Sequence, residues 1–264
     1  MSIAASRYSV APAPNVSALP SAQPALRVTF IIPAHNEAAT IGEVLQRIGD
    51  LKLDAQVVIV DDGSRDATAD IAETKLASLR GLVIRQPNRG KGAAIRAAIP
   101  HIDGEVVVIQ DADMEYDPAD VPRLIEPIVR GAADVVYGSR LSGGQPQRAY
   151  MFWHLVGNRF LSLVTNVLFN TTLSDMETGY KAFRADVLRS LRLRQDDFRI
   201  EPEITSEVCL RKLRIFEVPI AYYGRTYDEG KHITWRDGYK ALGVLVAARA
   251  RGTRSTVPAS RSSK

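Results

Sequence analysis

Two hydrophobic patterns alternate along the chain between residues 26 and 140. Short apolar runs rich in β-branched residues predict strands, and segments whose apolar residues recur every three or four positions predict helices. The runs are 26–32, 56–60, 82–85, 105–109 and 134–137; the helical segments are 37–51, 66–79 and 117–129, with another helix after the 88–92 loop. This alternation predicts an α/β fold with a mostly parallel sheet covered by helices on both faces.

The alternation stops after residue 141. Residues 150–169 predict a long helix rich in Phe, Leu, Val and Trp and interrupted by polar residues, which fits either a core helix or an amphipathic helix at a lipid surface. A helix through Leu213, a strand near 215–221 and a last helix over 235–248 should follow. We expect one domain over 27–248, a disordered extension over 1–26 and a basic disordered tail over 249–264.

The net charge of +4 lies in the two ends of the chain. Residues 1–27 and 249–264 hold seven basic residues and no acid, and without them the body has 27 basic against 30 acidic residues. The sequence therefore predicts no nucleic-acid-binding face, although the tail can contact an anionic membrane. No apolar stretch reaches about 18 residues, so no membrane span is expected.

Acidic residues follow three of the predicted strands. Asp111 and Asp113 come directly after the fourth strand and, on extended backbone, would face the same way as Glu115. Three carboxylates that repel one another favour a divalent cation; the alternative is that they cap the next helix and face water. Asp61 and Asp62 and the 33–37 segment should lie at the same edge of the sheet, which favours a nucleotide or metal site there.

Neither common phosphate-binding loop is present. The chain has no Gly-x-x-x-x-Gly-Lys-Ser/Thr motif, and Gly90-x-Gly92 lacks the third glycine of the dinucleotide fingerprint. ATP hydrolysis and hydride transfer are therefore disfavoured. An acidic site on an α/β sheet suits a nucleoside diphosphate bound through Mg²⁺ or Mn²⁺.

Seven motifs occur in an order that resembles one enzyme family. Pro-Ala-His-Asn-Glu (33–37), Asp-Asp-Gly-Ser (61–64), Asn-Arg-Gly-Lys-Gly (88–92) and Asp-Ala-Asp-Met-Glu (111–115) resemble inverting family 2 glycosyltransferases of the GT-A fold, which has a Rossmann-like nucleotide-binding half and an acceptor half. Gly-Ser-Arg (138–140), Ser-Asp-Met-Glu-Thr-Gly-Tyr-Lys (174–181) and the 225–231 loop are similar to the dolichol-phosphate mannosyltransferase and polyprenyl-phosphate glycosyltransferase branch. The resemblance covers residues 27–245.

The resemblance assigns roles to particular residues. It implies that the nucleotide sugar binds to Pro33, His35, Glu37, Asp61, Asp62, Lys91, Asp111, Ala112 and Asp113, and that Asp111, Asp113 and Glu115 hold Mg²⁺ or Mn²⁺. It places the acceptor phosphate at Arg140, Arg148, Arg159 and Ser162. The residues expected to act in catalysis are Asp113, Arg140, Asp175, Arg225 and Lys231, with Asp175 positioning rather than acting as a base. Glu115 departs from the Gln common in mannosyltransferases, so GDP-mannose and UDP-glucose types of donor both stay open.

The implied reaction is inverting transfer of a hexose to a dolichyl or undecaprenyl phosphate. Such a phosphate has a second pKa of about 6, so it attacks without a strong base. The expected location is the cytoplasm, peripheral on the inner face of the cell membrane. Two alternatives remain: a glycosyltransferase with a soluble acceptor, which would need Asp175 as a base, and a non-catalytic, membrane-recruited module that binds a nucleotide sugar.

Overall fold

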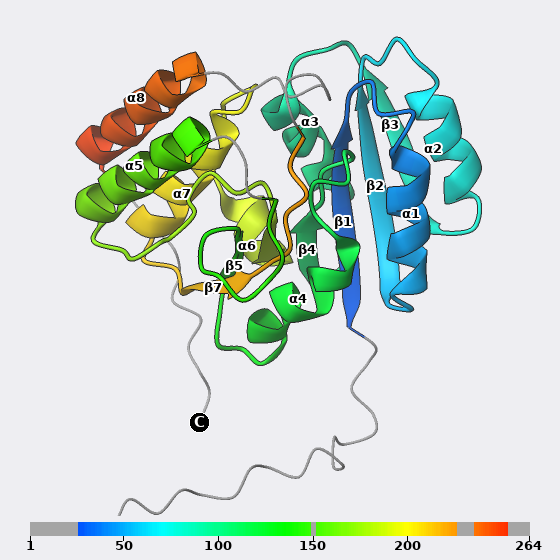
Figure 1. Ribbon diagram of the computed structural model, residues 1–264. Helices are drawn as coiled ribbons and strands as arrows, with labels where there is room; N and C mark the ends of the chain where they lie inside the picture. Colours follow the sequence, from blue (N-terminus) through cyan, green and yellow to red (C-terminus); the bar gives the residue numbers. More distant parts are fainter. Residues whose placement is uncertain (1–25, 149–151, 226–234, 253–264) are drawn as a thin grey trace, which may run out of the picture.

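Seven strands form one sheet in the computed structural model, which describes residues 26–148, 152–225 and 235–252 (Figure 1). Their order across the sheet is β3-β2-β1-β4-β6-β5-β7. The strands are β1 (Arg27–Ala34), β2 (Asp54–Asp62), β3 (Arg80–Gln86), β4 (Val106–Ile109), β5 (Val135–Ser139), β6 (Lys181–Arg184) and β7 (Ile215–Pro219). All strand pairs are parallel except those made by β6, which confirms the prediction of a mostly parallel sheet.

The predicted helices are present, with bounds that differ from the predicted ones by a few residues. They are α1 (Ile41–Asp50), α2 (Thr68–Leu76), α3 (Lys91–Ala98), α4 (Val121–Val129), α5 (Phe152–Phe169), α7 (Ile200–Leu210) and α8 (Trp235–Arg251). The structure adds α6 (Ala185–Ser190) and the short 3₁₀ helices η1 (Ile99–His101) and η2 (Pro118–Asp120). α8 continues to Arg251, past the predicted start of a tail at residue 249, and residues 1–25 and 253–264 lie outside the described residues.

The hydrophobic pattern predicts no strand at residues 181–184. The structure places β6 there, between β4 and β5 and antiparallel to both. The four residues Lys-Ala-Phe-Arg are too few and too polar at their ends for a periodicity signal, yet Ala182 and Phe183 are fully buried. This strand carries the chain back from the 174–180 segment to the middle of the sheet.

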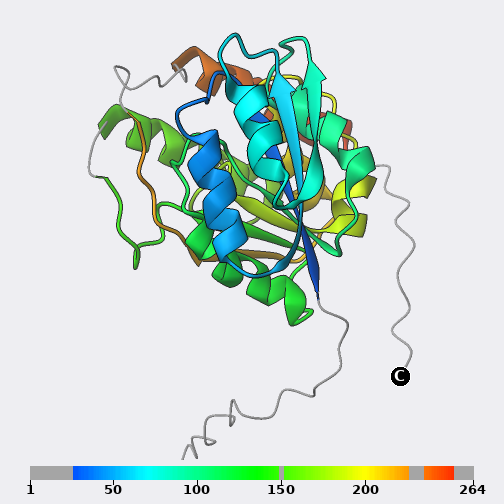
Figure 2. The ribbon, with the colours of Figure 1, turned by 90° about the vertical axis from the view of Figure 1, so that its right-hand side faces the viewer.

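Two hydrophobic cores cover the two faces of the sheet. Successive residues of a strand point to opposite faces, so Phe30 and Ile32 of β1 pack toward α1, α2 and α4, whereas Ile31 packs toward α3, α6 and α7. Figure 2 views the face that α1 and α2 cover. Helices α5 and α8 lie side by side outside α7 (Figure 1), joined by a third cluster that includes Leu161 and Leu245.

The parallel strands bring their carboxyl ends to one edge of the sheet. β1, β2 and β4 run in register and end at Ala34, Asp62 and Ile109, at the upper edge in Figure 1. The polar segments that follow these strands therefore come together, as predicted. Among the helices of the described ranges, none is long and apolar enough to cross a bilayer.

Candidate functional site

The acidic segment after β4 turns rather than continuing as a strand. β4 ends at Ile109, Met114 adopts a φ of +61°, and the backbone N–H of Glu115 donates to Asp113 Oδ1 at 3.0 Å. The expectation that Asp111, Asp113 and Glu115 form one extended row is therefore wrong. An Asp side chain that accepts from the backbone two residues ahead stabilises such a turn. Each of the three carboxylates consequently has different partners.

Asp111 is paired with Lys91, the first residue of α3. Lys91 Nζ lies 2.7 Å from Asp111 Oδ1 and 3.0 Å from Oδ2, and 3.2 Å from Oε1 of Glu201 on α7. The other oxygen of Glu201 accepts from Lys181. Burial alone would lower the pKa of Lys91, but Asp111 and Glu201 together raise it above its usual value. The four side chains form a series of alternating charges, of which Lys181 and Glu201 are buried.

Asp113 lies close to the carboxylates of Asp111 and Glu115. Burial, together with the nearby charges of Asp111 and Glu115, raises the pKa of Asp113 to about 7. A divalent cation would favour its ionised form. Within the described parts of the chain, no three Asp, Glu, His or Cys side chains converge into a metal site. Mg²⁺ commonly takes one or two carboxylates and completes its shell with water and substrate phosphates, which Asp111 and Asp113 fit.

Glu115 is engaged by the segment that follows β7. The Tyr222 hydroxyl donates to its Oε2 at 2.8 Å, and the backbone N–H of Arg225 donates to its Oε1 at 2.6 Å. The Arg225 guanidinium donates to both oxygens of Glu37, at 3.0 and 2.8 Å, and to the Asp113 carbonyl at 2.7 Å. Arg225 thus lies against the acidic segment and Glu37. Lys231, which was predicted to act with it, lies outside the described residues.

At the ends of β1 and β2, Asp62 binds the loop before α3, whereas Asp61 keeps an oxygen without a partner among the described atoms. Asp62 accepts from the backbone N–H groups of Arg89 and Gly90, at 2.9 and 2.7 Å, and so fixes the loop before α3. Its carbonyl lies 2.9 Å from Nδ1 of His35. Asp61 is buried, and its Oδ1 has no hydrogen-bond partner among the described atoms. Pro33 pairs with Val60 in the sheet, and Ala112 is buried in the core beneath the acidic segment.

Arg140 and Asp175 form the second charged centre of the site. Arg140 Nε and Nη2 donate to the two oxygens of Asp175, both at 2.7 Å, and the backbone N–H of Arg140 donates at 3.0 Å. Asp175 is fully buried, so its carboxylate is shielded from solvent and both of its oxygens are bound to Arg140. Glu217 of β7 fixes the same segment by accepting from the backbone of Ser174 and Asp175, at 2.9 and 3.2 Å. The Arg140 guanidinium lies 5.1 Å from the centre of the Tyr222 ring.

The other predicted acceptor residues are arranged differently. Ser162 of α5 is buried, and its hydroxyl accepts from the backbone N–H of Met176 at 3.0 Å, so it positions the 174–181 segment instead of facing a ligand. Arg148 is exposed and donates to the Gly224 carbonyl at 3.1 Å. Arg159 is exposed on α5. The structure therefore brings Arg140 and Asp175 together but does not bring Ser162 to an open surface.

The 175–181 segment passes directly over Asp111. A Cβ at Gly179 would come 2.6 Å from Asp111 Oδ2 and 2.7 Å from Lys91 Nζ. The backbone N–H of Gly179 donates to the Tyr116 hydroxyl at 3.0 Å. Sequence reasoning identified the segment but missed the roles of four residues here, namely Tyr116, Glu177, Glu201 and Tyr222. The acids of 174–184 and 198–203 were a signal for two of them; nothing in the sequence singles out the tyrosines.

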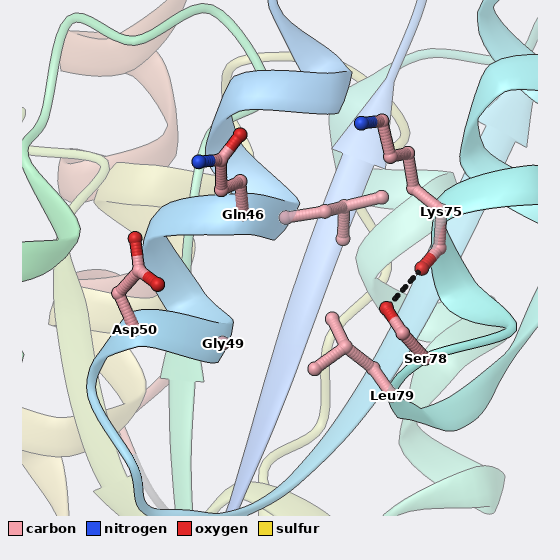
Figure 3. Close-up of a pocket in the computed structure, with 7 residues that line it drawn as sticks. Gln46, Gly49, Asp50, Lys75, Ser78 and Leu79 are labelled. Carbon is pink, nitrogen blue, oxygen red and sulfur yellow. Dashed lines mark hydrogen bonds between the residues drawn. The ribbon is translucent and has the colours of Figure 1, made fainter.

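A hollow of about 330 Å³ lies elsewhere, between α1 and α2 (Figure 3). Its lining residues are Leu45, Gln46, Gly49, Asp50, Lys75, Ser78 and Leu79. None of the predicted site residues takes part. The candidate site is therefore the charged edge formed by the segments after β1, β2 and β4, not this hollow.

A family model of glycosyl transferase family 2 matches residues 29–192. The chain belongs to this family. Family membership agrees with the motifs and with their position at the carboxyl edge of the sheet.

Two curated relatives are each 32% identical to this chain. Glycosyltransferase AglJ of Haloferax volcanii matches 75% of the chain and 63% of its own length, so the chain spans less than two thirds of that relative. Undecaprenyl-phosphate mannosyltransferase of Micrococcus luteus matches 78% of the chain and 87% of its own length. The predicted similarity to the polyprenyl-phosphate branch is confirmed.

A solved structure supports the fold. Glucosyl-3-phosphoglycerate synthase from Mycobacterium tuberculosis, crystallised with Mn²⁺, uridine diphosphate and glucosyl-3-phosphoglycerate, aligns with a TM-score of 0.67 over 85% of this chain and 80% of that one, at 21% identity. The predicted GT-A architecture is thereby confirmed. At this identity the likeness concerns the fold alone.

Proposed function

We propose that the protein transfers a hexose, with inversion, from a nucleoside-diphosphate sugar to a polyprenyl phosphate. The observation that carries the proposal is the pairing of Arg140 with Asp175, because it leaves guanidinium N–H donors that can bind a phosphate while occupying the carboxylate that a hydroxyl acceptor would need as a base. The similarity to undecaprenyl-phosphate mannosyltransferase supports the same acceptor class.

The donor side of the reaction is the edge after β1, β2 and β4. Asp61, buried and with an oxygen lacking a partner, suits the nucleoside, whose hydroxyl and ring N–H groups are hydrogen-bond donors. Asp111 and Asp113 would hold Mg²⁺ or Mn²⁺, which when bound offsets the negative charge of the departing diphosphate. Arg225 and Lys91 provide further positive charge beside the same carboxylates.

The acceptor side is Arg140. A guanidinium binds phosphate through paired N–H donors, and Asp175 holds its orientation. Because a phosphate monoester with a second pKa of about 6 is already largely ionised at neutral pH, its oxygen can attack the anomeric carbon without losing a proton to a base. The chain's contribution is then alignment of the two substrates and neutralisation of their charges.

A lipid acceptor also agrees with the surface of α5. Five of its exposed apolar residues recur at intervals of three or four positions and so form one stripe, with Trp153 beside it, 78% exposed. The stripe comprises Phe152, Val156, Phe160, Leu163 and Val167. On its inner side the same helix contacts the acceptor segment, since Asn158 Nδ2 donates to Asp175 Oδ1 at 3.4 Å and Ser162 holds Met176. We propose that this stripe lies on the membrane that contains the acceptor and makes the protein peripheral to it.

The decisive experiment is a transfer assay. Purified protein is incubated with Mg²⁺ or Mn²⁺, a polyprenyl phosphate and a panel of UDP- and GDP-sugars, and the lipid product is identified by mass. A polyprenyl-phosphate hexose is the expected product. Transfer only to a soluble sugar or phosphoglycerate would contradict the proposed acceptor, and absence of both transfer and donor hydrolysis would contradict a catalytic role.

A further inference from the structure

Glu177 is a carboxylate in the site whose Oε1 has no partner. This oxygen is buried and makes no hydrogen bond to any described atom, although the side chain as a whole is partly exposed. An ionised oxygen buried without a donor is unfavourable, so it points to a group that arrives from outside. Burial, and the charge of Glu201 after it, raises the pKa of Glu177 to about 7, which reflects the same lack of compensation.

The basic side chains around Glu177 are already neutralised by other carboxylates. The charges that act on Glu177 come from Glu201, Lys181, Arg140 and Asp175. Each basic group has its own acidic partner: Arg140 pairs with Asp175, Lys181 with Glu201, and Lys91 with Asp111 and Glu201. Glu177 is thus the one acid of this described group without a basic partner, and its Oε1 is left to accept a hydrogen bond from a ligand.

The position of Glu177 in its segment indicates which donor. Asp175, two residues before it, binds Arg140, and Gly179, two residues after it, lies against Asp111 and Lys91. In an inverting transfer the sugar ring lies between the attacking group and the leaving diphosphate. If these occupy Arg140 and the Asp111 side, as in the proposed function, the ring lies beside the middle of the 175–179 segment.

We propose that Glu177 determines donor specificity by accepting hydrogen bonds from hydroxyl groups of the transferred hexose. The inference rests on the proposed function, since that assigns the two ends of the segment to acceptor and donor. Two features of a sugar suit the carboxylate: its hydroxyls are neutral donors, and two adjacent hydroxyls can use both carboxylate oxygens. A sugar that carries its own carboxylate would be repelled, so Glu177 also selects against uronic acids.

The test compares binding of sugar nucleotides with binding of the nucleotide alone. Wild type, Glu177→Gln and the control Glu126→Gln, whose side chain is half exposed on α4, are titrated with UDP, UDP-glucose, GDP and GDP-mannose in the presence of Mn²⁺. For the sugar nucleotide that wild type prefers, we expect Glu177→Gln to weaken binding about 10–100-fold while leaving the matching nucleoside diphosphate unchanged. The control should match wild type for both.

A charged donor provides a second readout. Wild type should bind UDP-glucuronic acid more weakly than UDP-glucose, and Glu177→Gln should narrow that difference because the repulsion is gone. Equal affinity of wild type and Glu177→Gln for every sugar nucleotide would overturn the inference. So would a loss of turnover with donor binding intact, since that outcome assigns Glu177 to proton transfer. If wild type binds every sugar nucleotide no more tightly than the matching nucleoside diphosphate, both this inference and the proposed donor are wrong. Failure of transfer alone, with tighter binding of a sugar nucleotide, would leave this inference standing.

Discussion

Arg140 and Asp175 meet through two parallel hydrogen bonds of 2.7 Å, with the carboxylate fully buried and the guanidinium at the edge of the site. A planar guanidinium held at two of its three nitrogens keeps its remaining N–H groups in a fixed direction. The pair is therefore neutral as a whole, directs the remaining guanidinium N–H donors toward a ligand and contributes no free base. The pair therefore suits an acceptor that is already ionised and does not suit a hydroxyl acceptor, which needs a base.

Conservative changes at this pair should affect acceptor binding more than the chemical step. Arg140→Lys and Asp175→Asn each remove the paired geometry, and we expect the KM for polyprenyl phosphate to rise about 10–100-fold with a smaller fall in kcat. Steady-state kinetics at saturating donor measure both constants. Arg130→Lys is the control, because Arg130 makes an exposed pair with Glu126. A collapse of kcat in Asp175→Asn with unchanged acceptor KM would show that Asp175 is the base after all.

The carboxylates after β4 should differ in their importance for the cation. Asp113→Asn removes a carboxylate whose pKa is raised by burial and by the charges of Asp111 and Glu115, and we expect Mn²⁺ affinity in the presence of nucleoside diphosphate to fall about tenfold or more. Glu115→Gln should have a smaller effect on Mn²⁺, because Glu115 is held by Tyr222 and the backbone of Arg225. Titration of Mn²⁺ followed by electron paramagnetic resonance measures the free ion. A larger loss in Glu115→Gln would instead make Glu115 a direct ligand.

The difference between these carboxylates shows what sequence can and cannot determine here. Apolar periodicity located β1, β2 and β4, and parallel pairing then required the segments at 33–37, 61–64 and 111–115 to meet. Periodicity did not determine the directions of the side chains. The chain turns at Met114, and Glu115 accepts a hydrogen bond from Tyr222, which is far away in sequence. Contacts of that kind depend on tertiary packing rather than on local pattern.

The acceptor half shows the same limit. The 174–181 motif marked a functional segment, but the strand that follows it, β6, is four residues long and gives no periodic signal. Without β6 in the sheet, nothing indicates that Gly179 lies on Asp111 or that Glu201 reaches Lys91. The family resemblance similarly placed Ser162 at the acceptor phosphate, and in the structure its hydroxyl accepts from the backbone N–H of Met176.

The apolar stripe on α5 should govern binding to lipid vesicles. Leu163 is 59% exposed in the middle of the stripe, and Leu163→Glu places a charge where lipid contact is expected. We expect the fraction that floats with anionic liposomes to fall about tenfold or more, since burial of one Leu side chain contributes about 1.5–3 kcal/mol. Val129→Glu on α4 is the matched control, because Val129 is 51% exposed away from α5. Equal loss in both variants would exclude a specific role for the stripe.

Glu177 should also lower the stability of the ligand-free protein, in a way that depends on pH. Burial raises its pKa from 4.5 to about 7 in the folded chain, so the folded state holds this proton more tightly than the unfolded state does. The stability contributed by the protonated carboxyl is fully present below pH 4.5 and is lost as pH rises through 7. Glu177→Gln does not titrate and should therefore have a higher Tm than wild type at pH 8, by about 2 °C or more, and a smaller advantage at pH 5.

Thermal unfolding of both proteins between pH 5 and pH 8 measures the difference in Tm. Titration of the groups that both proteins share cancels in this difference. The charges of Glu201, Lys181, Arg140 and Asp175 are unchanged by the substitution, so the difference between the two curves isolates residue 177. A Tm below that of wild type at pH 8 would mean that Glu177 supports the fold through contacts of its own. A higher Tm together with weaker sugar-nucleotide binding is the result expected of a side chain kept for its ligand at the expense of stability.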